Sequence, residues 1–387
     1  MPRLPDPLKL HADGRGEHAA IIVDAASGDR PRVVSFAEHN ADVNRAAHAL
    51  RSLGMQPGER LVWCGPNSVE VLVTINATRK AAQIAVPLSY RFNGDEMQYV
   101  IDNSDATVVV VDAEQAPLVA SVRDRLPKVR SVVVFGGDAP AGCERWDDVL
   151  RGQPSDEPTL DDNASDVGAQ MLYTSGTTGK PKGALRTTTD PMIVMALLAE
   201  LGLVPGGEVH LTTGPLYHSG PLAFASISHT LGNPIVLLRK FDPTAWLHLV
   251  KEHRVTNTFS APTQLKRIVS LPPGELERAD MSSMRCLIAN AAPVPYALKE
   301  EVIEKLGDWF LYEVYGSTEL GIVTVLKPED QLRKPGSCGT TYGPIEVRIV
   351  RDEFKYQGIY LIEQGVPAGP DPYANIQEIR DFMLEHI

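Results

Sequence analysis

Short Val-rich runs alternate with helical segments through the first 135 residues, and this alternation constrains the fold more than any other feature. The runs at 60–64, 107–111 and 131–135 are apolar at consecutive positions rather than at every second one. A strand has this pattern when both faces of its sheet are covered, as in a parallel sheet between two layers of helices. The sequence therefore predicts an α/β fold built from repeated strand–helix units.

Capping residues mark where the helices begin and end. Ser35 precedes an apolar-periodic run and has Glu38 three residues later, which is the capping-box pattern. Gly54 ends that helix, and Asn93 begins another that ends near Asn103. One helical turn is expected near Trp146. The further expected elements are helices at about 68–82, 116–126, 243–253 and 295–306, and strands at 83–87, 208–213 and 234–238.

Changes in composition along the chain predict its domain boundaries. Residues 136–168 are rich in Gly, Asp, Pro and Ser, which is typical of a surface connection. We expect a first α/β subdomain at 1–168, a second at 169–350, and an atypical tail at 351–387. Asn375 is a candidate cap of a terminal amphipathic helix in that tail. The apolar face of this helix either docks on the large domain or contacts another chain.

Charge and segment composition exclude several classes of protein. The net charge of −12 is unfavourable for non-specific nucleic-acid binding, which needs a basic surface. The first twenty residues contain no apolar signal-peptide core, and no stretch approaches eighteen apolar residues, so no transmembrane segment is expected. Four cysteines show no paired or metal-binding spacing, which is typical of reduced thiols. These features together predict a cytoplasmic protein.

The stretch with the most chemical content is Tyr173-Thr-Ser-Gly-Thr-Thr-Gly-Lys-Pro-Lys-Gly183. It places four aliphatic hydroxyls, three glycines and two lysines within eleven residues. Glycines let the backbone N–H groups approach a phosphate closely, and the hydroxyls and lysines add donors and positive charge. The spacing differs from that of a P-loop, because only two residues separate Gly176 from Gly179. The sequence therefore predicts a phosphate-binding loop of another kind.

This loop resembles the signature loop of the adenylate-forming superfamily, which contains acyl-CoA synthetases, luciferases and peptide-synthetase adenylation domains. Segments 215–220 (PLYHSG), 290–293 (NAAP) and 315–319 (YGSTE) match later motifs in the family's order, and 79–88 resembles an earlier block. The resemblance covers about residues 20–350 and is closest to fatty acyl-CoA synthetases. It implies the family's large N-terminal domain, with two stacked parallel-sheet α/β subdomains, helices on both faces and a smaller β-rich part.

The resemblance also implies a role for each matching residue. Thr174, Lys182 and Glu319 are implied as catalytic, with Glu319 as the magnesium ligand. Thr174 and Lys182 would hold the β- and γ-phosphates of ATP with the loop, and Tyr315 would stack on adenine opposite Ala292-Pro293. The implied nucleotide-binding residues are Ser175, Gly176, Thr177, Thr178, Gly179, Asn290, Ala292, Pro293, Tyr315, Gly316, Ser317 and Thr318. The implied substrate-side residues are His218, Gly220 and Ala223.

The function implied is ATP-dependent activation of a carboxylic acid, with a fatty acid favoured, to acyl-adenylate and acyl-CoA. Its ligands would be the acid, ATP, Mg²⁺ and coenzyme A, with no nucleic acid. The family continues with a Thr-Gly-Asp segment and a small mobile domain that carries a lysine, and the 387 residues contain no Thr-Gly-Asp. Three alternatives follow: an acyl-CoA synthetase in a truncated, impaired form, a nucleotide- or acyl-binding protein without turnover, or one half of a split enzyme. The partner of the chain would then be a separate small domain or a second copy in a homo-oligomer.

Overall fold

The computed structural model describes residues 6–160, 168–174, 181–186, 190–318, 320–351 and 357–363. The chain forms two compact units, one made of residues 1–188 and 215–240 and the other of residues 189–214 and 241–387. The proposed terminal helix at 375–387 lies outside the described residues. Within the described part, no helix is long and apolar enough to cross a membrane.

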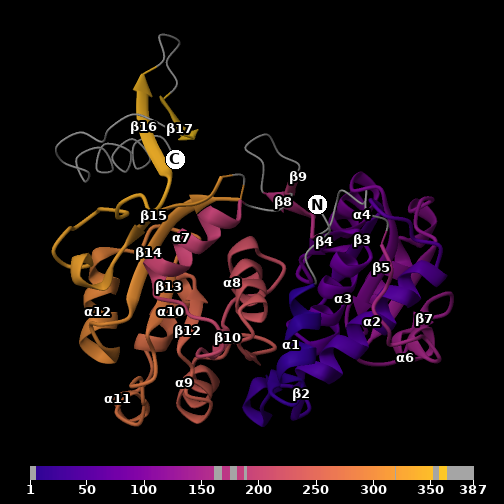
Figure 1. The fold of residues 1–387 in the computed structure, drawn as a ribbon, viewed down its shortest axis with the longest axis horizontal. Coiled ribbons are helices and arrows are strands. Elements are labelled where there is room, and N and C mark those ends of the chain that lie inside the picture. Colours follow the sequence, from indigo (N-terminus) through magenta and orange to yellow (C-terminus); the bar gives the residue numbers. More distant parts are fainter. Residues whose placement is uncertain are drawn as a thin grey trace. The chain divides into compact units, whose positions relative to one another are not determined.

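The first unit contains a sheet of seven strands, in the order β7-β6-β5-β3-β4-β8-β9 (Figure 1). All neighbouring strands are parallel except β8 and β9, which form an antiparallel pair. The strands are β3 (Arg60–Cys64), β4 (Ile84–Leu88), β5 (Ala106–Asp112), β6 (Ser131–Phe135), β7 (Glu144–Arg145), β8 (Gln170–Thr174) and β9 (Lys182–Arg186). Three more strands, β1 (Ala19–Val23), β2 (Arg32–Ser35) and β11 (Ile235–Leu237), pair in the order β11-β1-β2.

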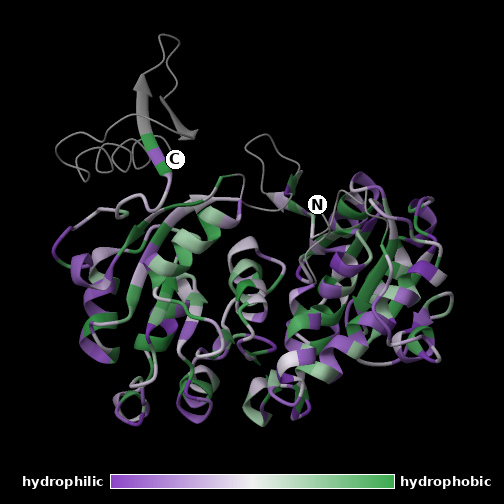
Figure 2. Cartoon of the chain, viewed as in Figure 1, coloured by the Kyte–Doolittle hydropathy of each residue, from purple (hydrophilic) through white to green (hydrophobic). Residues whose placement is uncertain are grey.

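Helices of the first unit cover both faces of the seven-stranded sheet. Along β3, Leu61 and Trp63 belong to one core together with residues of α2 and α3, whereas Val62 and Cys64 belong to a second core with residues of α4 and α5. Figure 2 shows the apolar colour concentrated in these strands. The helices are α1 (Pro7–Arg15), α2 (Phe36–Ser52), α3 (Val69–Lys80), α4 (Gly94–Asn103), α5 (Ala116–Ser121), α6 (Trp146–Leu150) and α8 (Ser219–Thr230). The consecutive apolar residues of each strand therefore face two cores, as the sequence predicts.

Five strands of the second unit pair in the order β15-β14-β13-β12-β10, and among them only β15 is antiparallel to its neighbour. The strands are β10 (His210–Thr212), β12 (Asn257–Ser260), β13 (Cys286–Ala289), β14 (Leu311–Ser317) and β15 (Gly321–Leu326). Its helices are α7 (Pro191–Leu201), α9 (Pro243–Glu252), α10 (Pro262–Val269), α11 (Pro273–Leu276) and α12 (Tyr296–Leu306), and α10 contacts both α9 and α12. The predicted α/β fold class, with predominantly parallel sheets, is confirmed.

Most element boundaries agree with the capping signals. Ser35 and Asn93 both form full capping boxes, with Glu38 and Glu96 as the reciprocal partners. The helix predicted at 116–126 is shorter, because α5 ends at Ser121 and the chain continues as a 3₁₀ turn. The antiparallel pair β16 (Ile345–Arg351) and β17 (Gln357–Glu363) was not predicted as a hairpin, and β17 falls inside the segment expected to be an atypical tail.

A buried lysine holds the segment that follows β7 against the helices of the first unit. The Lys80 ammonium donates to both carboxylate oxygens of Glu157, at 2.7 and 2.8 Å, and to the side-chain carbonyls of Asn40 and Asn44. Burial lowers the pKa of Lys80 to about 8, although Glu157 acts in the opposite direction. These contacts explain how a segment with the composition of a surface connection follows α2 and α3 closely.

Candidate active site

The predicted phosphate loop joins two paired strands of the first unit. Thr174, the last residue of β8, is the direct cross-strand partner of Lys182, the first residue of β9. The hairpin therefore holds the two ends of the loop beside each other, with Lys182 exposed. Five predicted residues of this loop lie outside the described residues: Ser175, Gly176, Thr177, Thr178 and Gly179.

Helix α4 anchors both ends of this loop. The Tyr173 hydroxyl donates to Asn103 Oδ1 at 2.8 Å, and the Tyr99 hydroxyl donates to the carbonyl of Pro181 at 3.1 Å. Burial raises the pKa of Tyr173 to about 12, so the phenol keeps its proton for this bond even in alkaline solution near pH 10. A Cβ atom at Gly183 would lie 3.0 Å from Met171 Sδ, so a side chain there would require the Met171 side chain to move. Hydrogen bonds from α4 therefore hold the residues at both ends of the loop in place.

The predicted substrate-side residues gather at the start of α8. His218 is the N-cap residue, and Gly220 and Ala223 lie on the first turns of the helix. Ala223 is exposed and Gly220 is half-buried, so this end of the helix presents small residues at the surface. Desolvation and, second, the positive charge of Arg91 lower the pKa of His218, which favours a neutral imidazole near pH 7. The Tyr217 ring lies 4.4 Å from the imidazole, measured between ring centroids.

A buried asparagine fixes the segment that carries His218. Asn67 Oδ1 accepts from the backbone N–H of Leu216 at 2.8 Å, and Asn67 Nδ2 donates to the carbonyl of Leu238 at 3.0 Å. Its partners lie 149 and 171 residues away in the chain. One side chain that follows β3 therefore binds the 215–240 segment at both of its ends. Sequence reasoning missed Asn67, because an isolated asparagine after a strand is also an ordinary turn residue.

In the second unit, β13 and β14 bring the predicted nucleotide-binding segments together. The two strands are parallel neighbours, with Ala289 opposite Glu313. Asn290 follows β13, and its side-chain amide donates to the carbonyl of Val314 on β14. The Asn290, Ala292 and Pro293 segment and the segment that begins at Tyr315 therefore lie side by side.

The turn after Asn290 has an unusual backbone. Ala291 has a φ of +75°, a left-handed conformation that costs a residue with a side chain about 1–3 kcal/mol. Ala291, Ala292 and Pro293 are exposed, whereas Val294 is buried. The three exposed residues form a protruding turn between two fixed ends, and such strain is typical of binding sites.

The segment that begins at Tyr315 is partly described. Tyr315 is half-buried, and burial together with nearby Cys338 raises its pKa. A side chain at Gly316 would collide with the carbonyl of Gly321 on β15, so glycine is required there. Ser317 Oγ accepts from the N–H of Leu320 at 3.1 Å, and Thr318 follows the end of the strand. Glu319, the predicted magnesium ligand, lies outside the described residues.

The structure therefore assembles the predicted residues in two sets. Lys182, Thr174, His218, Gly220 and Ala223 belong to the first unit, whereas Asn290, Ala292, Pro293, Tyr315, Gly316, Ser317 and Thr318 belong to the second. Thr174 and Lys182 lie at strand ends and the other residues of the first set lie at the start of α8, whereas the second set lies after β13 and at the end of β14. Strand ends are where α/β folds bind their ligands.

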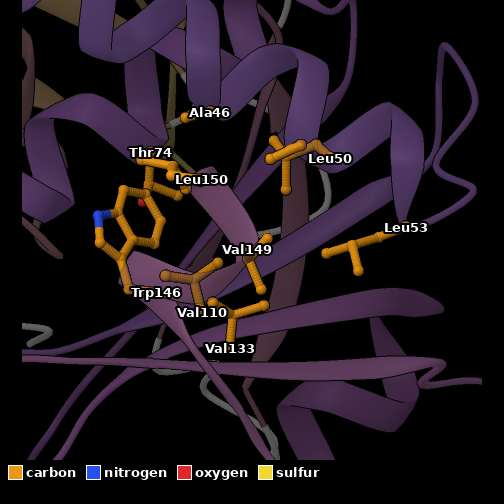
Figure 3. Close-up of a pocket in the computed structure, with 10 residues that line it drawn as sticks. Ala46, Leu50, Leu53, Thr74, Val110, Val133, Trp146, Val149 and Leu150 are labelled. Carbon is orange, nitrogen blue, oxygen red and sulfur yellow. The ribbon is translucent and has the colours of Figure 1, made fainter. Parts of the chain in front are cut away.

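An apolar pocket in the first unit is separate from these residues (Figure 3). It is lined by Ala46, Ala49, Leu50, Leu53, Thr74, Val110, Val133, Trp146, Val149 and Leu150. Thr74 is the single polar residue in this lining, and none of the predicted site residues belongs to it. A pocket with this lining offers no group that would orient a polar substrate.

A buried histidine in the second unit predicts that stability falls in acid. His210 Nδ1 lies 2.7 Å from Asn257 Oδ1, and burial lowers the pKa of His210 from 6.5 to about 4. Below pH 6.5 the unfolded chain takes up a proton that the folded chain refuses, so this contribution is present above pH 6.5 and is lost toward pH 4. We expect His210 to account for a loss of about 2 kcal/mol between pH 7.5 and pH 5.

Urea unfolding of the His210→Gln variant at these two pH values measures that loss. The variant should lose less stability on acidification than the wild type, whatever its stability at pH 7.5. His18→Gln, at an exposed histidine, is the control and should retain the wild-type pH dependence. Equal acid sensitivity of His210→Gln and the wild type would contradict the assignment.

Comparison with known proteins gives one family. The model of the AMP-binding enzyme family matches residues 8–366. A feruloyl-CoA synthase from an Amycolatopsis species is 33% identical over 322 residues, which cover 82% of this chain and 61% of that protein. A long-chain-fatty-acid–CoA ligase of Mycobacterium tuberculosis is 30% identical over 318 residues, which cover 81% of this chain and 61% of the ligase. The chain thus spans about three fifths of the length of the curated relatives it matches.

A solved structure shows the same fold. The inhibitor-bound N-terminal domain of FACL13 from Mycobacterium tuberculosis superposes with a TM-score of 0.77 at 28% sequence identity. The match covers 91% of this chain and 85% of that domain.

Proposed function

Because the chain belongs to the AMP-binding enzyme family, we propose that it activates a carboxylic acid with ATP and transfers the acyl group to coenzyme A. The observation that carries this proposal is the phosphate-loop sequence on a hairpin that pairs Thr174 with Lys182. The parallel pair β13–β14 supports it by placing the NAAP turn beside the strand that carries Tyr315. Relatives with 30% identity or more include proteins named for feruloyl, indoleacetate, long-chain fatty acyl and 4-coumarate groups. We therefore propose a carboxylic acid, with a fatty acid as the first candidate and an aromatic acid as the second.

The proposed first step is an in-line displacement. The carboxylate oxygen attacks the α-phosphorus of ATP, the bond to the β-phosphate oxygen breaks, and pyrophosphate leaves. Lys182 neutralises charge on the β- and γ-phosphates, so the protein acts through positioning and electrostatics. In the second step, the coenzyme A thiolate attacks the acyl carbon and AMP leaves.

We also propose that magnesium accompanies the nucleotide, with one carboxylate of this chain among its ligands. Among the described residues, no group of three or more His, Cys, Asp and Glu side chains is placed to hold a metal. Mg²⁺ commonly binds one or two carboxylates and completes its octahedron with phosphate oxygens and water. Glu319 is the carboxylate that we propose for this role.

The impaired synthetase, the binding protein without turnover and the split enzyme would all bind nucleotide, and they differ in turnover. The 387 residues contain no Thr-Gly-Asp segment. We therefore propose that a polypeptide of these residues binds nucleotide but turns over slowly, and that a separate small domain would increase its rate. We also propose a cytoplasmic location, on the basis of the four cysteines, none of which is disulfide-bonded.

Calorimetry with Mg-ATP, followed by exchange of labelled pyrophosphate into ATP over a panel of carboxylic acids, tests the proposal. We expect nucleotide binding, exchange that depends on the added acid, and a smaller magnesium dependence in the Glu319→Gln variant, whose amide lacks the charge a hard cation needs. No binding at millimolar nucleotide would contradict the proposed function. Binding without exchange for any acid would favour the non-catalytic alternative, and exchange restored by an added small domain of a relative would favour the split enzyme.

A further inference from the structure

A buried ion pair lies directly beneath the exposed turn at 291–293. Glu313 of β14 is 8% exposed and Lys299 of α12 is 3% exposed. Lys299 Nζ forms an ion pair with Glu313 Oε2, and Glu313 Oε1 accepts from the backbone N–H of Val294 at 3.3 Å. Val294 is the first residue after the exposed turn. The carboxylate therefore connects the end of the turn, the helix that follows it and the strand that carries Tyr315.

Asn290, at the other end of the turn, is also held by hydrogen bonds. The backbone N–H of Asn290 donates to the carbonyl of Ser260 at 3.3 Å, and its side chain donates to Val314. Ala291, at a φ of +75°, lies between these two attachments. A residue with a side chain keeps this conformation only where the surrounding contacts determine it. The contact from Glu313 is thus one of the restraints that keep the turn in this shape.

We propose that Glu313 is a positioning residue that holds the 291–293 turn in the shape that receives the adenine base, while Lys299 fixes the direction of the carboxylate. The inference rests on the proposed function, in which Ala292-Pro293 and Tyr315 enclose the base. Glu313 precedes Tyr315 by two residues on the same strand, so both belong to one face of β14. One side chain therefore sets the distance between the two walls of the base site.

Two double variants separate positioning from stability. Lys299→Met/Glu313→Leu replaces the ion pair with apolar side chains and removes the acceptor for Val294. Lys299→Met/Glu313→Gln also removes the ion pair, but it keeps a carbonyl acceptor at the same place. Both avoid an unpaired buried charge, which is the usual cause of unfolding when one partner is lost. Glu301→Gln is the matched control, since Glu301 is also on α12 and pairs with Lys266 at 2.6 Å on the surface.

AMP affinity by calorimetry and the thermal midpoint are measured for each variant. We expect Lys299→Met/Glu313→Leu to weaken AMP binding about 10-fold, which corresponds to the loss of one hydrogen bond. We expect Lys299→Met/Glu313→Gln to weaken it less than 3-fold. Adding Ala291→Gly to the Glu313→Leu double variant should restore affinity, because glycine adopts the left-handed conformation without support. Glu301→Gln should match the wild type.

Three other outcomes would each contradict the inference. Wild-type AMP affinity in the Glu313→Leu double variant, with the wild type binding normally, overturns the inference and leaves the proposed function intact. Equal losses in both double variants, with no recovery from Ala291→Gly, also overturn it and assign the pair to stability alone. Failure of the wild-type chain to bind AMP at all overturns the proposed function and this inference with it.

Discussion

Replacing Lys182 with alanine should lower the rate of acid-dependent pyrophosphate exchange by about 100- to 1,000-fold. In the proposed function, this ammonium neutralises the charge on the leaving pyrophosphate. Removing one preorganised donor from a site where charge develops costs about 2.7–4 kcal/mol, which corresponds to that loss in rate. The hairpin predicts that the loss is local, because Lys182 is exposed and its backbone pairing with Thr174 does not depend on the side chain.

The affinities for ATP and AMP distinguish a phosphate contact from a general disturbance. Lys182→Ala should weaken ATP binding about 10- to 100-fold, the range for a charged hydrogen bond, and should leave AMP binding nearly unchanged, because AMP lacks the β- and γ-phosphates. Lys128→Ala is the control, since Lys128 is an exposed lysine of the same unit that pairs with Asp105. Exchange within 3-fold of the wild type in Lys182→Ala would remove this lysine from the reaction.

Local signals were sufficient to predict much of the fold. The capping boxes at Ser35 and Asn93 place two helix starts to the residue, because each side chain binds a backbone group within the same turn. The strand at 131–135 is also placed to the residue. By contrast, the helix predicted at 116–126 ends at Ser121. Its apolar residues continued the pattern, but a 3₁₀ turn follows α5 and leads the chain toward β6.

The parts of the site that sequence reasoning missed depend on contacts between distant residues. Glu313 is the single charged residue of β14, and Lys299 follows a buried leucine in α12. In the sequence, each of the two is typical of an exposed residue, and only the fold shows that they pair with each other in the interior. Asn67 is similar, since its partners are more than 140 residues away. A motif identifies the residues expected to touch the ligand, whereas the residues that hold the motif in place follow from packing.

The Asn67→Ala variant should lose about 3 kcal/mol of unfolding free energy. Asn67 is 4% exposed, and the Leu216 N–H and Leu238 carbonyl that it binds belong to residues that are 1% exposed. Removing the side chain leaves the buried Leu216 N–H without this acceptor, which costs about 1–3 kcal/mol, and removes one hydrogen bond to the Leu238 carbonyl, which is worth about 1 kcal/mol. The loss should also raise the KM for the acid, because the same contacts hold the segment that carries His218. Urea unfolding and steady-state exchange measure the two effects.

Asn67→Asp tests which of the two bonds matters, because the shapes of the two side chains are nearly the same. One carboxylate oxygen can still accept from Leu216, but the other faces the carbonyl of Leu238 where the amide donated. At pH 8 the introduced carboxylate is buried against that carbonyl, so the variant should be less stable than Asn67→Ala. When the pH is lowered toward 5, the carboxyl group takes up a proton and donates to Leu238, so its stability relative to the wild type should rise. This direction follows from the folded pKa of the introduced carboxyl, which lies above its unfolded value because burial disfavours the charged form. A variant that shows no such recovery would mean that the Leu238 contact contributes little, and that Asn67 holds the His218 segment through Leu216 alone.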